Sequence, residues 1–569
     1  MSDSDGSAGK LPLTFGIEIE HLFGINMDII SSDPAYQVLL PQDCMLEANR
    51  DNLTGYDPKH KSHTGLLQAV RILREYGARI KVQLSQEGDG SFDMFSKWNM
   101  SHDGSVKFPT HPIELRVWSD DKIRDMAGWQ FAGLELISPA LKVPNLDSLG
   151  LQPNGLVELA AYLALLTKNH PPDAPYFFLS GPQVAGVHVH IGLQPQPEGQ
   201  VEIPVAFLQH LAFICLAFED TTTLLHHPHR HGYVTSYARN HVGTNRFVGK
   251  WPPGDFPRHS CNQGSKFLCE DAFLRIFRAS DRTELVELLT TRNGQPWMQT
   301  EFFVRECFVN FSNCLENLDR SYKRTIEFRQ HHGTLAFEDL SQWVVFVTAL
   351  GRAAERKAKE TPRDDGTQPQ SVIQKIEAAR ARGRASVNVE ESGVLGMAPN
   401  VPRSHIKDIP PEKLWEDTAF DIDATTTIVQ EASKYPDIFQ EGKKRSLKEL
   451  FDLLELPLDV RQYWWQRAKK FRAEWATNWQ SQSTCQPDYY CWSEPVRDCE
   501  GWADGELDSP PWDVGAAGAG RAPRDPFRPL QAGGFPIHLV DADVDVDMMD
   551  TEPPTTGTRA GPSRRRSFP

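Results

Sequence analysis

Three short segments of this chain alternate strictly between apolar side chains and charged or imidazole side chains, at Phe15–Glu20, Gly186–His190 and Thr325–Arg329. Successive side chains of a β-strand point to opposite faces, so residues two apart share a face. The polar pairs that share a face in this way are Glu18 with Glu20, His188 with His190, and Glu327 with Arg329. The pattern therefore predicts three strands, each with one apolar face and one face that carries titratable groups.

A fourth segment, Gly133–Pro139, places one charged residue, Glu135, among aliphatic side chains. If the four strands join one sheet, one face enters the core and the other gathers carboxylates, imidazoles and a guanidinium. Such a surface can hold divalent metal ions and phosphates. We call it the polar floor, and its predicted members are Glu18, Glu20, Glu135, His188, His190, Glu327 and Arg329.

The rest of the first 360 residues contains further strand and helix patterns. Two more strands are expected at Arg79–Leu84 and Lys97–Ser101. Apolar residues at helical spacing predict helices at Leu66–Tyr76, Gly155–Thr167, Phe207–Leu225 and Phe337–Lys359. Long irregular connections interrupt the strands, so the pattern indicates an α+β fold and not a repeating βαβ architecture.

Composition divides the chain into five expected parts. Residues 1–10 are polar and expected to be disordered, 11–360 form one globular unit, and 361–404 form a linker. Residues 405–500 are expected to be helical and Trp-rich, and 501–569 to be a disordered tail. The clearest helices of the fourth part are Leu447–Leu456 and Tyr463–Trp479. A stripe along the second helix predicts packing onto the main unit or a partner helix, and consists of Trp464, Ala468, Phe471, Trp475 and Trp479.

Length, charge and cysteine content exclude some classes of function. A chain of 569 residues with 40% hydrophobic content can bury a large core. Its net charge of −16 argues against a general nucleic-acid binder. The acidic start gives no secretory signal, and no apolar run reaches membrane-spanning length. Nine cysteines without a CxxC pair favour reduced thiols and a cytoplasmic protein.

Each polar segment has a simpler explanation when it is taken alone. The acidic pair could be a solvent-facing edge of the sheet, the two histidines a polar patch, and Glu327 with Arg329 a surface ion pair. Together, carboxylates and imidazoles without thiolates suit Mg²⁺ or Mn²⁺ beside substrate phosphates. The sequence has no Walker-type or kinase-like Gly-rich loop, so a nucleotide would be held mainly through metal ions.

The order of these motifs resembles the amidoligase family found in fungi and bacteria. That family belongs to the carboxylate–amine ligase superfamily of glutamine synthetase and γ-glutamylcysteine synthetase. The motifs that carry the resemblance are FGIEIE, GLELISP, GVHVHIGL and TIEFRQHHGTL, with Trp98 and Asp103-Gly104-Ser105 between the first two. The resemblance covers about Leu11 to Arg356. It implies a mainly antiparallel, curved sheet of the glutamine synthetase catalytic-domain type, with helices packed on its apolar face.

The resemblance also implies an activity, the ATP-dependent joining of a carboxylate to an amine through an acyl phosphate. The positions that match metal ligands, for Mg²⁺ or Mn²⁺, are Glu18, Glu20, Glu135, His188 and Glu327. His190 matches a position that contacts the phosphates of ATP, and Arg329 matches the arginine that stabilises the transferring phosphoryl group. Glu327 and Arg329 are thus the expected catalytic residues, and Asp103 is a candidate for orienting the amine. Small molecules, an amino acid or peptide among them, are the expected substrates.

The family pattern leads us to expect an acidic residue directly after Gly333-Thr334-Leu335, but Ala336 and Phe337 come before Glu338 and Asp339. A substrate or helix-capping role at this point is therefore not assigned. Substrate choice is expected to lie in loops such as 118–130 and 233–256.

Several rival interpretations remain open. The histidine-rich segment 226–231 suggests zinc, although a polar helix end near the cleft explains it better. A second zinc candidate is the loose group Cys485, Cys491 and Cys499, and a cysteine nucleophile would be Cys261 or Cys307. The main alternative to an enzyme is a catalytically inactive ligase-fold protein that binds a metabolite or a partner.

Overall fold

The computed structural model describes residues 10–50, 53, 59–84, 96–106, 128–146, 154–167, 174–181, 185–194, 202–218, 221–222, 224–226, 269–290, 309–314, 324–362, 369–374, 376–377, 422–439 and 446–482. All of them belong to one compact unit, Met1–Arg521. None of the helices in these ranges combines the length and the apolar content that a membrane crossing requires.

The described strands form one open, mostly antiparallel sheet of nine strands. Its main path runs β2-β3-β4-β1-β7-β9-β8, while β5 and β6 also pair with β1. The pairing of β2 with β3 is parallel, in contrast to the other pairings of the sheet. The strands are β1 (Leu13–Asn26), β2 (Ile80–Gln83), β3 (Trp98–His102), β4 (Trp129–Ile137), β5 (Leu141–Lys142), β6 (Tyr176–Leu179), β7 (Gly186–Leu193), β8 (Val309–Asn310) and β9 (Ile326–His332).

Strand β1 is the long central strand of the sheet, and its alternating sequence separates the two faces. Phe15, Ile17 and Ile19 are buried in the main hydrophobic core. Glu18 and Glu20 point to the opposite face, as the two-residue period requires. The four segments that define the polar floor all became strands, so the expected division into an apolar and a polar face is confirmed.

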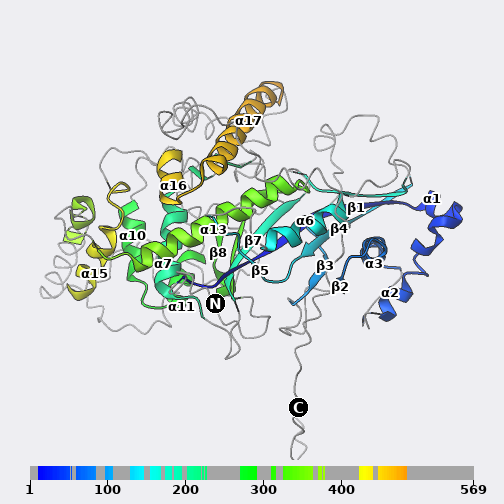
Figure 1. Cartoon of the computed structure of the whole chain (residues 1–569), viewed down its shortest axis with the longest axis horizontal. Helices are drawn as coiled ribbons and strands as arrows, with labels where there is room; N and C mark the ends of the chain where they lie inside the picture. Colours follow the sequence, from blue (N-terminus) through cyan, green and yellow to red (C-terminus); the bar gives the residue numbers. More distant parts are fainter. Residues whose placement is uncertain are drawn as a thin grey trace, which may run out of the picture. The chain divides into compact units, whose positions relative to one another are not determined.

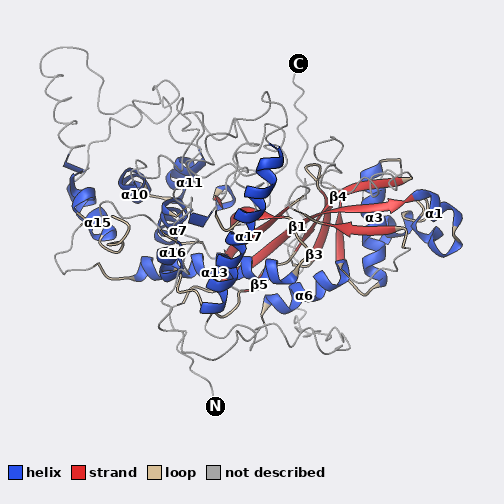
Figure 2. Cartoon of the chain, turned by 90° about the horizontal axis from the view of Figure 1, so that it is seen from above, coloured by secondary structure: helices blue, strands red, loops and turns tan. Residues whose placement is uncertain are grey.

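Three helices cover the apolar face of the sheet: α3 (Lys61–Glu75), α6 (Gly155–Leu166) and α13 (Phe337–Lys359). A glycine in each lies close to the sheet, and a Cβ placed at Gly155 of α6 would come 2.6 Å from Phe15 of β1. Figures 1 and 2 show α6 and α13 along the same side of the strands. This layer completes the core and lies on the face of the sheet opposite to the polar floor.

The C-terminal helices share the same hydrophobic core. They are α15 (Ile422–Ala432), α16 (Leu447–Leu453), which begins with a capping box at Ser446, and α17 (Leu458–Gln482). Trp464 of α17 is fully buried, with its ring 5.4 Å from that of Phe346 in α13. The predicted packing of the α17 stripe onto the main unit is therefore confirmed for Trp464, Ala468 and Phe471.

The remaining described elements lie around this framework. They are α1 (Met27–Ser32), η1 (Pro34–Leu39), α2 (Met45–Arg50), α7 (Val205–Ala217), α10 (Cys269–Arg278), α11 (Arg282–Thr290) and η6 (Ser312–Cys314). Helix α7 packs against α13 and, through Phe213, against the aromatic rings of α10. The architecture is thus α+β, as predicted, and α10 contacts α7, which in turn contacts α13.

Candidate metal centre

The strands that carry the polar floor are direct neighbours in the sheet, in the order β4-β1-β7-β9. Register then aligns their polar residues across the strands. Glu20 of β1 lies opposite Glu135 of β4, and Glu18 lies opposite His188 of β7. On the other side of β7, His190 lies opposite Glu327 of β9. The structure therefore brings all of the predicted metal-ligand residues together on one face.

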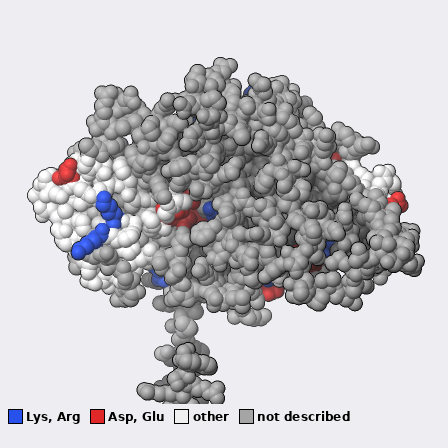
Figure 3. Space-filling view, turned by 180° about the vertical axis from the view of Figure 1, so that it is seen from behind, with Lys and Arg blue, Asp and Glu red and all other residues white. Residues whose placement is uncertain are grey.

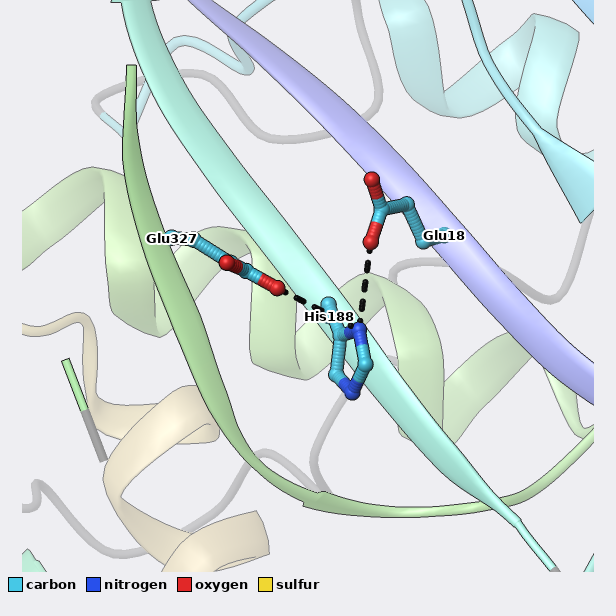
Figure 4. Close-up of side chains that lie close together, drawn as sticks. All are labelled: Glu18, His188 and Glu327. Carbon is cyan, nitrogen blue, oxygen red and sulfur yellow. Dashed lines mark hydrogen bonds and ion pairs between the residues drawn. The ribbon is translucent and has the colours of Figure 1, made fainter. Parts of the chain in front are cut away.

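The first group of potential ligands consists of Glu18, His188 and Glu327, one from each of three strands (Figure 4). His188 Nδ1 lies 3.1 Å from Glu18 Oε2 and 3.4 Å from Glu327 Oε1. Two ligands at right angles about one ion, each about 2.1 Å from it, are about 3 Å apart. The spacing and the oxygen–nitrogen donor set therefore fit a divalent cation such as Mg²⁺ or Mn²⁺.

The second group consists of Glu20, Glu135 and His188. Here the other ring nitrogen is involved, because His188 Nε2 lies 3.3 Å from Glu20 Oε1. In each group the ligand atoms all lie within 4.8 Å of one another, and every residue is buried. His188 thus stands between two candidate cation positions, with one ring nitrogen directed at each.

An irregularity in β9 sets the position of Arg329. Phe328 pairs with Val189 and His331 with Val187, so two residues of β9 lie opposite the single residue His188. β-Bulges of this kind are common beside functional sites, where they redirect a side chain. The guanidinium of Arg329 contacts Glu327 Oε1 directly. The bulge therefore places the predicted phosphate-binding arginine beside the first group.

The electrostatics of the floor depend on this arginine. Burial on its own would raise the pKa of Glu327, but Arg329 and the two histidines outweigh that effect and the repulsion from Glu18, and hold the pKa at about 2. Glu327 is therefore an anion at neutral pH, as a metal ligand must be. Figure 3 looks at the molecule from the side opposite to Figure 1 and shows acidic side chains in the middle of that face, with a basic side chain beside them.

Three further groups contact the side chains of the floor and hold them in place. Asn310 Nδ2 of β8 donates to Glu327 Oε2 at 2.8 Å, and the backbone N–H of Gly186 donates to Glu20 Oε2 at 2.5 Å. Thr325 Oγ1 lies 3.1 Å from His190 Nδ1, while His190 Nε2 lies 3.1 Å from Glu18 Oε1. Supporting contacts of this type fix the orientation of ligands. Only the strand register reveals Asn310, which pairs with Glu327, since nothing in the local sequence marks it.

Asp103 follows β3 and belongs to neither ligand group. Its Oδ1 accepts a hydrogen bond from the backbone N–H of Ser105 at 2.7 Å, which stabilises a local turn. Its own N–H donates to the carbonyl of Gly133 on β4. A role toward a substrate amine therefore stays a prediction for Asp103.

His226, at the start of the histidine-rich segment, does not form the polar helix end that we expected. It is fully buried, with its ring 4.7 Å from that of Trp343 in α13 and 5.7 Å from that of His331. Helix α13 covers the apolar face of the sheet, so His226 belongs to an aromatic cluster on that face and not to the polar floor. The other histidines of 226–231, the five cysteines proposed above for zinc or for nucleophilic catalysis, and the loop 233–256 lie outside the described residues.

Comparison with known proteins adds no identification. No protein-family model matches this chain, and neither the curated proteins nor the solved structures give a match. The functional conclusion therefore depends on the site itself and on the motifs described above.

Proposed function

We propose that this chain is an ATP-dependent carboxylate–amine ligase, built on a fold of the glutamine synthetase catalytic type, that forms an amide through an acyl phosphate. One observation carries the proposal: four neighbouring strands bring Glu18, Glu20, Glu135, His188 and Glu327 together in two metal-type groups, with Arg329 beside them. The order of the motifs, which resembles that of the amidoligases, supplies the reaction class.

The two ligand groups give Mg²⁺ or Mn²⁺ its place in the proposal. The first would be held by Glu18, His188 and Glu327, and the second by Glu20 and Glu135 with the other side of His188. Bound there, the ions would neutralise the charge of the ATP phosphates and favour attack on the terminal phosphorus. Burying several carboxylates on one face is costly unless cations compensate them, which explains why the floor would exist at all.

The side chains around these groups bind and orient the reactants. Arg329 presents a planar guanidinium that suits two phosphoryl oxygens, and it stabilises charge that develops during transfer. His190 is held between Thr325 and Glu18, next to the same group, where it can contact a phosphate. Asp103 is the candidate for orienting the amine.

The chemistry proceeds in two balanced steps. A carboxylate oxygen of the first substrate attacks the γ-phosphorus, the bond to ADP breaks, and an acyl phosphate forms. The amine then attacks the acyl carbon, inorganic phosphate leaves, and the amine loses a proton as the amide forms. In phosphoryl transfer the protein contributes mainly positioning and charge stabilisation, which are the properties this floor offers.

The test uses hydroxylamine as a general amine. Purified protein is incubated with ATP, Mg²⁺, hydroxylamine and pools of amino acids, peptides and other small carboxylates, and both ADP and hydroxamate are measured. The proposal predicts that both products appear together and only with the right carboxylate. Glu18→Ala and Glu327→Ala should abolish them, whereas Glu75→Ala, a change at a solvent-exposed position on α3, should not.

Two results would contradict the proposal. Full activity in either floor variant would show that the ligands are misassigned. Absence of any metal-dependent nucleotide binding would remove the basis for ATP chemistry, and nucleotide binding without turnover would favour the inactive ligase-fold alternative.

A further inference from the structure

Both carboxylate oxygens of Glu327 have a donor. Oε2 accepts a hydrogen bond from Asn310 Nδ2 at 2.8 Å. Oε1 contacts the guanidinium of Arg329 and also lies 3.4 Å from His188 Nδ1. Glu327 is only 4% exposed, and Asn310 fixes the direction of its carboxylate. The oxygen that a metal ion would share with His188 is therefore the same oxygen that Arg329 holds.

Arg329 has the surroundings of a counter-ion. Burial opposes its charge, but the carboxylates of Glu327, Glu20 and Glu18 outweigh burial and raise its pKa above the usual range. The Arg329 side chain keeps 19% exposure, against 5% for that of Glu327. The guanidinium thus lies at the border of the floor, on a long side chain that can turn outward.

We propose that Arg329 is an exchangeable counter-ion: a divalent cation bound by Glu18, His188 and Glu327 displaces its guanidinium, which then becomes the binding group for an anionic, phosphate-bearing substrate. This inference rests on the proposed function and adds an order to it, with the metal before the anion. Two cations on one carboxylate oxygen repel each other strongly in a buried site. The divalent ion is fixed by three ligands, whereas the guanidinium can move.

The exchange explains how one floor can bind both a metal cation and a phosphate anion. Before the metal binds, the positive charge of Arg329 is paired with Glu327, and the four carboxylates of the floor repel phosphate. After exchange, the guanidinium faces outward beside a divalent ion, and planar, bidentate recognition of phosphoryl oxygens becomes available. Anion affinity at this site is therefore conditional on the metal.

The test measures how fast phenylglyoxal, an arginine-specific reagent, modifies each arginine of the wild-type protein, with peptides identified by mass spectrometry. Arg352 is a matched control, because its side chain is 21% exposed and is paired with Glu355 at 2.6 Å, on α13. The proposal predicts that Mg²⁺ increases the labelling rate of Arg329 several-fold and leaves that of Arg352 unchanged. An excess of chelator should reverse the effect.

A second measurement separates this inference from the proposed function. Mn²⁺ binding is followed by electron paramagnetic resonance in the wild type, Arg329→Gln and Arg352→Gln. Loss of the competing charge should tighten the first Mn²⁺ about tenfold in Arg329→Gln only. If Mn²⁺ binds but the labelling of Arg329 is unchanged or slower, the exchange is wrong and the metal centre stands. If Mn²⁺ does not bind at all, the metal centre and the proposed function both fail.

Discussion

Replacing His188 by alanine should remove both candidate cation positions at once. Nδ1 of its ring faces Glu18 and Glu327, at 3.1 and 3.4 Å, and Nε2 faces Glu20 at 3.3 Å. Glu327→Gln and Glu135→Gln should instead each impair a single group, because each residue belongs to only one of them. The loss of metal binding in His188→Ala should therefore equal the losses in the two glutamate variants taken together.

The magnitude follows from binding linkage. An ion present at about 100 times its dissociation constant adds about 2.7 kcal/mol to the free energy of unfolding for each site it fills. We expect an increment of about 5 kcal/mol in the wild type if both sites fill independently, about half of it in either glutamate variant, and nearly none in His188→Ala.

The assay is urea unfolding followed by tryptophan fluorescence, with Mn²⁺ or with a chelator. His102→Ala is the control, since this half-buried histidine on β3 belongs to neither ligand group and should leave the increment intact. Two results would refute a floor in which one imidazole serves two groups. One is that His188→Ala keeps the full metal-dependent increase in the free energy of unfolding, and the other is that Glu327→Gln alone loses all of it.

Three further predictions concern charge and packing. The folded pKa of Glu327, about 2, lies below the ordinary 4.5, so its ionised form contributes stability above pH 4.5 that is lost as the pH falls towards 2. In the presence of chelator, Glu327→Gln should therefore lower the free energy of unfolding by about 3 kcal/mol at pH 7 and by much less near pH 2. Urea unfolding at both pH values measures this difference. Gly133→Ala should destabilise the folded protein by about 1–3 kcal/mol or more, because a Cβ there would come 2.0 Å from a backbone oxygen. Gly16→Ala, where the nearest contact of a Cβ would be 3.6 Å away, should be tolerated. Thermal unfolding of both variants measures the difference. Arg467→Ala should speed hydrogen exchange in α17, because Arg467 contacts Asp339 of α13 and donates to the β9 residue His332 at 3.0 Å, and Arg467→Lys should restore protection only in part.

The two-residue period of the polar segments was enough to predict the faces of the sheet. Side chains such as Ile17 and Glu18 must separate on any strand, so the floor's composition follows from the sequence directly. The helices of the apolar face were equally predictable from the sequence, and Phe337–Lys359 became α13 with the same bounds. Periodicity over many residues leaves few alternatives for such a segment.

The alternating pattern could not predict which strands pair with one another. Nothing local shows that β9 pairs with β7, or that a bulge opposite His188 turns Arg329 toward Glu327. The same limit explains the two misjudged or missed residues. His226 looks polar in its histidine-rich segment and is buried by aromatic rings from α13 and α17, while Asn310 reaches Glu327 only because β8 pairs with β9.

The most direct test of the ligase proposal follows an oxygen atom. Once a carboxylate substrate is found, it is labelled with ¹⁸O and incubated with ATP, Mg²⁺ and hydroxylamine, and the inorganic phosphate is analysed by mass spectrometry. An acyl phosphate predicts that one labelled oxygen moves from the carboxylate to the phosphate for each amide formed. Release of unlabelled phosphate with ADP, or of AMP and pyrophosphate, would contradict the account.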